Sequence, residues 1–337
     1  MSTLIDEWRR MRLNAGSGNG HGYLMDLRST KNEVRAFLAI QRPGLYSAIV
    51  IELPDTIRPR SLTSSSTGAF EVEVAAFQGL RDGRIGVAVN LLDASFEDLF
   101  AVFADEILSG VATSPTAQQA AQAVNRCIAR WRCFVDSGRR SLSDEEVRGL
   151  IGELTVLGRL AGRFGFDRVL SGWKAPGGSI RDFELESSSL EVKSYQVQSG
   201  PALRINDPAQ LEPSPGRPLH LCAVRLALSD SGRTLPELIR FISDMHSTQP
   251  RVVQHFEDLL ASYGYLPSQS KRFTDRFSIG PVSVYAVEGG FPRIRPVEVP
   301  AGVEDVRFSL PIGAIAPYET SSEAIIGAAL ETLETMT

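Results

Sequence analysis

The stretch SIRDFELESSSLEVKSYQ at residues 179–196 constrains the fold of this 337-residue chain more than any other. Two runs of alternating side chains flank the polar turn ESSS, a pattern typical of two paired β-strands. Alternation places Glu191 and Lys193 on one face of the second strand, about 6.5–7 Å apart at Cα. Pairing across the turn would bring Asp182 close to Glu191. The stretch is therefore either a solvated charged hairpin or a site built from two carboxylates and a lysine.

Two neighbouring carboxylates repel each other unless a cation lies between them. Asp182 and Glu191 offer the hard oxygen ligands that Mg²⁺ prefers, together with water and substrate phosphate. Mn²⁺ accepts the same ligands and could substitute. A lysine beside the metal can orient or deprotonate a water molecule, or stabilise charge that develops on a phosphate. The pattern therefore predicts that Asp182, Glu191 and Lys193 are catalytic in phosphodiester hydrolysis, with the two carboxylates as metal ligands.

Lysine is scarce in this chain. All but four of the 35 basic residues are arginine, and the four are Lys31, Lys174, Lys193 and Lys271. A lysine that persists in such a chain indicates a position that needs a compact ammonium group rather than a planar guanidinium. Arginine also stays protonated and is a poor base. The competing interpretation is that Lys193 only forms an ion pair with one of the glutamates.

A predicted helix upstream carries Glu153 at the edge of its apolar stripe, where an ionised carboxylate needs a partner. Gly149 and Gly152 lie in the same turn and weaken the helix by up to ~1 kcal/mol each relative to alanine. We therefore expect this helix to pack closely on the sheet and to deliver Glu153 as a further catalytic residue and metal ligand. The alternative is a structural salt bridge from Glu153 to Arg181 or Lys193.

The first part of the chain is predicted to be rich in β-structure. Residues 24–93 are mostly β-branched or alternating runs separated by turn signals, and helices follow at about 95–110 and 115–135. Residues 1–112 are therefore expected to form a β-rich α+β N-terminal domain. Its role is not evident from any motif.

The remainder, residues 113–337, is expected to form an α/β domain whose core spans about residues 140–295. A capping box at residues 143–146 opens a helix, and two strands, a helix, a buried strand at 219–228 and another helix follow. The end of the chain is predicted to be helical.

Composition excludes several classes of protein. A chain that is 43% hydrophobic and 22% charged is typical of soluble globular proteins, and its net charge of −5 excludes a globally basic nucleic-acid binder. It has no apolar run of about 18 residues and no signal-peptide core, so we expect no association with a membrane. The cysteines Cys127, Cys133 and Cys222 form no paired framework, which fits a cytoplasmic location.

The acidic and basic residues of the second domain resemble the PD-(D/E)xK nuclease superfamily. Glu153 in GLIGEL, Asp182 in RDFEL and the EVK triplet at 191–193 match its order of helical acid, strand Asp and strand Glu-x-Lys. Arg181 replaces the proline of the motif's name. More narrowly, residues 140–295 resemble a bacterial family of PD-(D/E)xK-motif proteins through further segments such as INDPAQL and FPRI.

The resemblance implies a restriction-endonuclease-like core, in which helices flank a mixed sheet, and an Mg²⁺-dependent endonuclease that cuts DNA. Members of the bacterial family are often encoded beside methyltransferase, helicase-like and ATPase genes in restriction or phage-defence clusters. The implied partners are DNA and such proteins, and the chain could also form a homodimer. The alternative is a non-catalytic nuclease-fold subunit that binds DNA or serves as a scaffold. An unrelated α/β enzyme is a third hypothesis, although no other catalytic motif is present.

Four polar residues are candidates for contact with DNA. Ser194 and Gln196 follow Lys193 and could touch either a phosphate or solvent. Asn206 and Gln210 lie in the segment NDPAQL, which could either approach DNA or form the capped start of a short helix.

Overall fold

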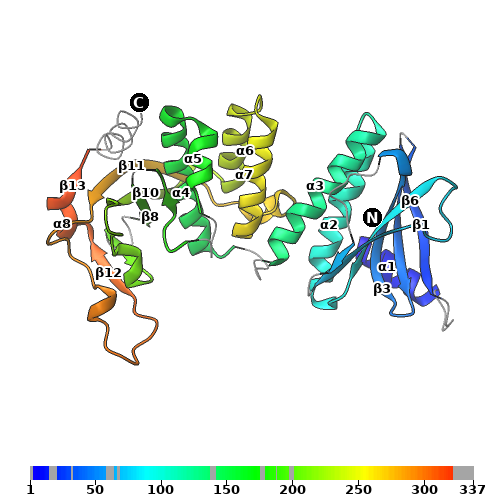
Figure 1. The fold of residues 1–337 in the computed structure, drawn as a ribbon, viewed down its shortest axis with the longest axis horizontal. Helices are drawn as coiled ribbons and strands as arrows, with labels where there is room; N and C mark the ends of the chain where they lie inside the picture. Colours follow the sequence, from blue (N-terminus) through cyan, green and yellow to red (C-terminus); the bar gives the residue numbers. More distant parts are fainter. Residues whose placement is uncertain are drawn as a thin grey trace. The chain divides into compact units, whose positions relative to one another are not determined.

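The computed structural model describes residues 3–14, 21–31, 33–57, 64–66, 69–136, 142–174, 179–186, 188–196 and 201–321 (Figure 1). It divides into two compact units, Met1–Arg140 and Ser141–Thr337. All residues of the predicted site belong to the second unit. The helix expected at the end of the chain lies outside the described residues. No described helix combines the length and the apolar character needed to cross a membrane.

The N-terminal unit contains a six-stranded antiparallel sheet in the order β1-β2-β3-β6-β5-β4. Its elements are α1 (Leu4–Asn14), β1 (Gly22–Lys31), β2 (Val34–Arg42), β3 (Tyr46–Pro54), η1 (Asp55–Ile57), β4 (Ser65–Ser66), β5 (Phe70–Ala75), β6 (Arg84–Leu91), η2 (Ala94–Phe96), α2 (Glu97–Thr113) and α3 (Ala117–Asp136). Phe103 of α2 packs edge-to-face on Trp131 of α3, with ring centroids 5.2 Å apart. Because α3 shares this core, the structure divides at residue 140 rather than at residue 112.

The second unit contains the α/β core. Its elements are α4 (Asp144–Phe164), α5 (Phe166–Gly172), β7 (Phe183–Glu184), β8 (Ser189–Gln196), β9 (Ala202–Ile205), η4 (Pro208–Leu211), β10 (Leu219–Arg233), α6 (Leu235–Met245), α7 (Pro250–Tyr263), η5 (Pro267–Arg272), β11 (Phe277–Ala286), η6 (Pro296–Glu298), β12 (Phe308–Pro311), α8 (Ile312–Ile315), η7 (Ala316–Tyr318) and β13 (Glu319–Thr320).

The main sheet of this unit has the order β13-β11-β10-β8-β7. Strand β8 runs parallel to β10, whereas β7 pairs with β8, and β11 with β10, in the antiparallel direction. The sheet is therefore mixed, as predicted. The central strand β10 is the apolar run predicted at 219–228, and its residues 219–224 are all buried.

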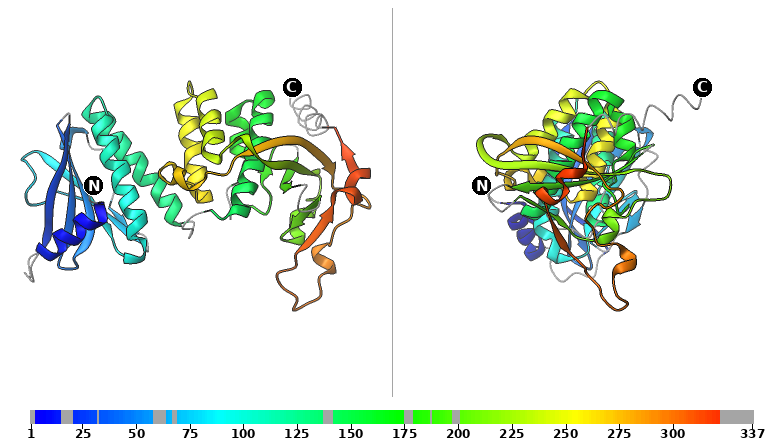
Figure 2. Two further views of the ribbon diagram at one scale, coloured as in Figure 1. Left: turned by 180° about the vertical axis from the view of Figure 1, so that it is seen from behind. Right: turned by 90° about the vertical axis from the view of Figure 1, so that its left-hand side faces the viewer.

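Two apolar clusters sandwich this sheet. Val224 of β10 and Val192 of β8 join α4, α5, α6 and α7 in one cluster. Leu221 and Ala223 of β10 join the short β9–β12 sheet and α8 in the other. Figures 1 and 2 show the four helices together on one side of the sheet and β12 on the other. Alternation along β10 therefore assigns neighbouring side chains to two different layers.

Helix α4 begins as the sequence predicts and approaches the sheet closely at one of its two early glycines. Ser143 and Glu146 form the predicted capping box. A Cβ atom at Gly152 would overlap Ser194 Oγ of β8, so the missing side chain allows the close contact. A Cβ atom at Gly149 would meet open space, so the prediction of close packing is wrong for that residue.

Candidate active site

The hairpin that carries the motif forms as predicted. Strand β7 pairs with β8 in the register Phe183↔Leu190 and Glu184↔Ser189. Asp182 immediately precedes β7, so the same register brings it opposite Glu191. Strand β7 is the edge strand of the sheet, so Asp182 lies at the edge, whereas Glu191 lies on the next strand inward, β8, in register with Leu221 of β10.

Alternation along β8 separates its packing residues from its charged residues. Ser194 and Val192 face α4, because both lie beside the position of a Cβ at Gly152. Glu191 and Lys193 alternate with them and lie in register with Leu221 and Ala223 of β10. The predicted division of β8 into an apolar face and a charged face is confirmed.

Lys193 and Glu191 are in direct contact. Lys193 Nζ lies 2.6 Å from Glu191 Oε1, and the two side chains are 14% and 0% exposed. Glu191 Oε2 is also buried and has no hydrogen-bond partner among the described residues. A buried carboxylate oxygen without a partner is costly. This oxygen is therefore the group in the site that most requires a further ligand.

The Asp182 carboxylate is held against β8 by a backbone amide. Val192 N–H donates to Asp182 Oδ2 over 2.6 Å, and Lys174 N–H donates to the Asp182 carbonyl oxygen over 2.9 Å. One bond holds the side chain of Asp182, and the other holds its backbone. The Asp182 carboxylate therefore has a fixed orientation toward β8.

Glu153 is the third carboxylate, and two aromatic residues hold it. Trp173 Nε1 donates to Glu153 Oε2 over 2.8 Å, and the Tyr263 hydroxyl donates to the same oxygen. The two rings are stacked, with centroids 5.1 Å apart and an angle of 18° between their planes. Glu153 is only 8% exposed. We call Trp173 and Tyr263 the aromatic clamp.

The predicted alternative for Glu153, a salt bridge to Arg181 or Lys193, is not what the structure contains. The Arg181 guanidinium instead donates to the backbone carbonyls of Ala209 and Glu212. Lys193 pairs with Glu191.

The sequence interpretation missed both residues of the aromatic clamp. Trp173 stands directly before Lys174 in the loop that leads to the hairpin, and its position near the motif was a usable signal. Tyr263 lies 110 residues from Glu153 at the end of α7, and no local pattern marks it.

The three carboxylates lie close enough to repel one another. Burial, and next the charge of Asp182, raise the pKa of Glu153 well above its usual value. Burial also raises the pKa of Asp182, against the opposing effect of Lys193. Burial and the charge of Asp182 raise the pKa of Glu191 to about 8. The charges of Asp182, before β7, and of Glu191 on β8 therefore both act on Glu153 of α4.

The same carboxylates also shift the pKa of Lys193. Burial lowers the pKa of its ammonium group, but the charges of Glu191, Asp182 and Glu153 outweigh burial and raise it. This shift favours the ammonium form of Lys193, which can donate hydrogen bonds and stabilise negative charge.

The donor set of the site fits a hard divalent cation. In the described part of the chain, no three His, Cys, Asp or Glu side chains are grouped as a ready metal site. The Lys193 ammonium group contacts Glu191 Oε1, so a bound cation would have to lie beside this ammonium group. Carboxylate oxygens of Asp182 and Glu191, with Glu153 nearby, are nevertheless the ligands that Mg²⁺ uses. The unsatisfied Oε2 of Glu191 supports this fit.

The four candidate DNA contacts are dispersed. The Ser194 hydroxyl oxygen is buried against α4, and Gln196 is half-buried at the end of β8. Asn206 N–H donates to Gln210 Oε1 over 3.2 Å at the start of η4, where the Asp207 carboxylate accepts from Ala209 N–H. These bonds match the capped start that the sequence offered as an alternative. Contact with DNA stays a prediction for all four residues.

Comparison with curated proteins and with solved structures finds no match to this chain. A family model does match, over residues 4–313. Its description is "Putative PD-(D/E)XK family member" (DUF4420). The match includes both compact units and all four residues of the predicted catalytic motif. The chain therefore belongs to the DUF4420 family of PD-(D/E)XK proteins.

Proposed function

We propose that this protein hydrolyses DNA phosphodiester bonds as an Mg²⁺-dependent endonuclease, and that Mn²⁺ can substitute. One observation carries the proposal: Lys193 Nζ lies 2.6 Å from Oε1 of the buried Glu191, the β7–β8 register sets Asp182 opposite Glu191, and the charge of Asp182 acts on Glu153 of α4. A cluster of three carboxylates and a lysine, with one carboxylate oxygen unsatisfied, is poorly suited to a purely structural role.

Each residue has a distinct part in the proposed reaction. Asp182 and Glu191 hold the cation, with Glu153 as a further ligand. The bound cation would supply an activated water and neutralise charge on the phosphate. Lys193, as an ammonium group, donates hydrogen bonds to the phosphate oxygens or to the leaving oxygen. The aromatic clamp keeps Glu153 Oε2 occupied and so orients its second oxygen.

The decisive experiment compares wild type with Lys193→Ala in DNA cleavage assays that contain Mg²⁺ or Mn²⁺. We expect wild type to nick or cut DNA and the variant to lose cleavage by about 10²-fold or more, the effect of removing one donor that stabilises developing charge. Circular dichroism checks that the variant remains folded. Equal cleavage by both proteins would remove Lys193 from the mechanism.

The direct contact between Lys193 and Glu191 favours a second candidate, a non-catalytic subunit that binds DNA or acts as a scaffold. In that case the lysine simply neutralises Glu191. Calorimetric titration of Mn²⁺ into wild type and Asp182→Ala separates the two candidates. Binding that is lost in the variant supports the nuclease, whereas equal binding, or none by either protein, supports the scaffold.

We further propose that the protein works in the cytoplasm as part of a bacterial restriction or phage-defence system. Its partners would then include methyltransferase, helicase-like or ATPase proteins, and a homodimer is compatible with this role. The support is the resemblance of residues 140–295 to proteins encoded in such clusters. Cleavage that appears only after such a partner is added would be the expected behaviour of a dependent subunit.

A further inference from the structure

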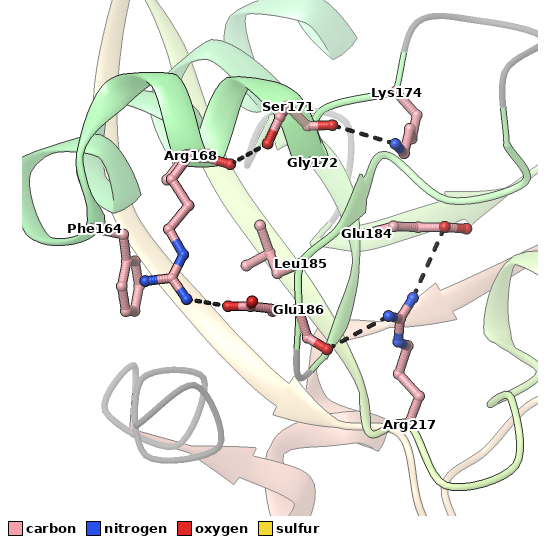
Figure 3. Close-up of a pocket in the computed structure, with 10 residues that line it drawn as sticks. Phe164, Arg168, Ser171, Gly172, Lys174, Glu184, Leu185, Glu186 and Arg217 are labelled. Carbon is pink, nitrogen blue, oxygen red and sulfur yellow. Dashed lines mark hydrogen bonds and ion pairs between the residues drawn. The ribbon is translucent and has the colours of Figure 1, made fainter. Parts of the chain in front are cut away.

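A cavity of about 320 Å³ lies beside strand β7, where α5 ends. Figure 3 shows its rim of charged side chains, Arg168, Lys174, Glu184, Glu186 and Arg217, with Leu185 between them. We call it the β7 cavity. We propose that it binds a backbone phosphate of the DNA strand, away from the bond that is cut, with Lys174 as the main ligand. This inference rests on the proposed function.

Two segments of the chain connect the β7 cavity to the carboxylate cluster, because each contributes residues to both. Glu184 lies two residues beyond Asp182, and Lys174 N–H donates to the Asp182 carbonyl oxygen over 2.9 Å. Trp173, which holds Glu153, directly precedes Lys174. Phosphates follow one another every ~3.4 Å of helix rise along a DNA strand. A strand held at the cluster therefore brings neighbouring phosphates to the rim of this cavity.

Lys174 is the cation most available to a phosphate. Its ammonium group donates to the carbonyl oxygen of Ser171 over 3.3 Å and forms no salt bridge within the described residues. An ammonium group has three N–H donors, so at least one remains free for a phosphate oxygen. Lys174 is also one of four lysines in an arginine-rich chain, and a compact ammonium is well suited to a single phosphate.

Two arginines on the rim can also bind the phosphate, because breaking their present ion pairs costs little free energy. Arg168 pairs with Glu186, and the two side chains are 44% and 56% exposed. Arg217 Nη1 lies 3.8 Å from Glu184 Oε2, with exposures of 36% and 39%. Ion pairs as exposed as these contribute roughly 0–1 kcal/mol, so a phosphate can replace the carboxylates.

The acidic residues of the rim do not prevent phosphate binding. The Ser179 hydroxyl donates to Glu184 Oε1 over 2.7 Å, so Glu184 has a partner besides Arg217. The rim also carries three cations against two carboxylates. Its net charge is therefore positive in a chain whose overall charge is −5. Such a local excess is the electrostatic feature that a backbone phosphate recognises.

The test measures binding of a fluorescent DNA duplex by anisotropy in EDTA, where cleavage cannot occur. Wild type, Lys174→Gln and the matched control Lys271→Gln, which changes an exposed lysine on η5, are titrated at several salt concentrations. Each lost phosphate contact reduces the slope of log K against log salt by about 0.9. We expect this reduction, and binding that is about 3- to 10-fold weaker, for Lys174→Gln alone.

A second variant tests the competition on the rim. Glu186→Gln removes the carboxylate that competes for Arg168, so we expect tighter DNA binding and a steeper salt dependence. A purely structural role for the Arg168–Glu186 pair predicts unchanged or weaker binding.

The outcomes separate this inference from the proposed function. Lys174→Gln that keeps the wild-type slope and affinity shows that the phosphate site is wrong, and so does wild type that fails to bind DNA. Neither result bears on the nuclease proposal, which stands or falls with the loss of cleavage in Lys193→Ala.

Discussion

At the scale of single residues, the site is organised by the way each carboxylate is held. Asp182 accepts a backbone N–H, Glu191 contacts Lys193, and Glu153 accepts two aromatic donors on one oxygen. These partners compensate part of the cost of burying negative charge. Among the described residues, nothing donates a hydrogen bond to Glu191 Oε2. The burial of negative charge at the site is therefore only partly compensated by its own side chains and backbone.

The aromatic clamp should matter for metal binding. Tyr263→Phe removes one donor from Glu153 Oε2 while keeping the ring stack with Trp173, so the ionised carboxylate loses stabilisation. We expect Mn²⁺ affinity to fall by about 10-fold, as for other residues that orient metal ligands. Calorimetry at fixed pH measures the effect. Tyr265→Phe is the matched control, because its ring packs on Phe273 instead; equal losses in the two variants would exclude a specific role for Tyr263.

At the scale of elements, the contact of α4 with β8 determines where Glu153 stands. Of the two glycines in its second and third turns, Gly149 and Gly152, only Gly152 lies close to β8. Its missing Cβ leaves room for Ser194 Oγ. The cost of glycine in a helix is thus offset at residue 152 by close packing. At residue 149 the surroundings show no corresponding contact.

The two glycines should respond differently to alanine. Gly149→Ala fills open space and should stabilise the protein by up to ~1 kcal/mol through helix propensity. Gly152→Ala displaces the Ser194 side chain from its staggered rotamer, which costs roughly 0.5–1.5 kcal/mol and cancels that gain. Adding Ser194→Ala to Gly152→Ala should recover it, in a double-mutant cycle by urea denaturation. Additive effects in that cycle would show that the two residues do not interact.

At the scale of the whole molecule, two units carry separate cores. The N-terminal unit contains its own buried ion pair: Glu52 is fully buried and accepts from the side chains of Arg35 and Arg81 and from Arg81 N–H. Burial raises the pKa of Glu52, but the two arginines outweigh it, and the pKa is lowered overall.

The Glu52 interactions predict a pH dependence for the N-terminal unit. A carboxyl group whose folded-state pKa is lowered contributes stability above its unfolded pKa, and that stability disappears as the pH falls through the folded pKa. Glu52→Gln should therefore destabilise the protein by roughly 1–3 kcal/mol at pH 7, with a smaller difference from wild type below about pH 4. Hydrogen exchange should accelerate within residues 1–140 and remain unchanged across 142–321. Equal acceleration in both ranges would indicate one cooperative unit.

Short-range patterns in the sequence predicted the hairpin, the two faces of β8, the capping box of α4 and the buried strand β10. Each depends on the geometry of a strand or a helical turn, which spans only a few neighbouring residues. The Asp182, Glu191 and Lys193 motif could be identified for the same reason. All three residues lie within one hairpin.

Only the tertiary structure decided what these residues contact. It placed Tyr263 on Glu153 across 110 positions, directed Arg181 to the backbone of residues 209–212 and packed α3 with the first unit. It also assembled the β7 cavity from three separate segments. Which distant residues come into contact depends on how helices and strands pack. The local periodicity of the sequence does not encode that packing. The sequence by itself therefore determined which residues form the motif, whereas the fold decided how each carboxylate is held.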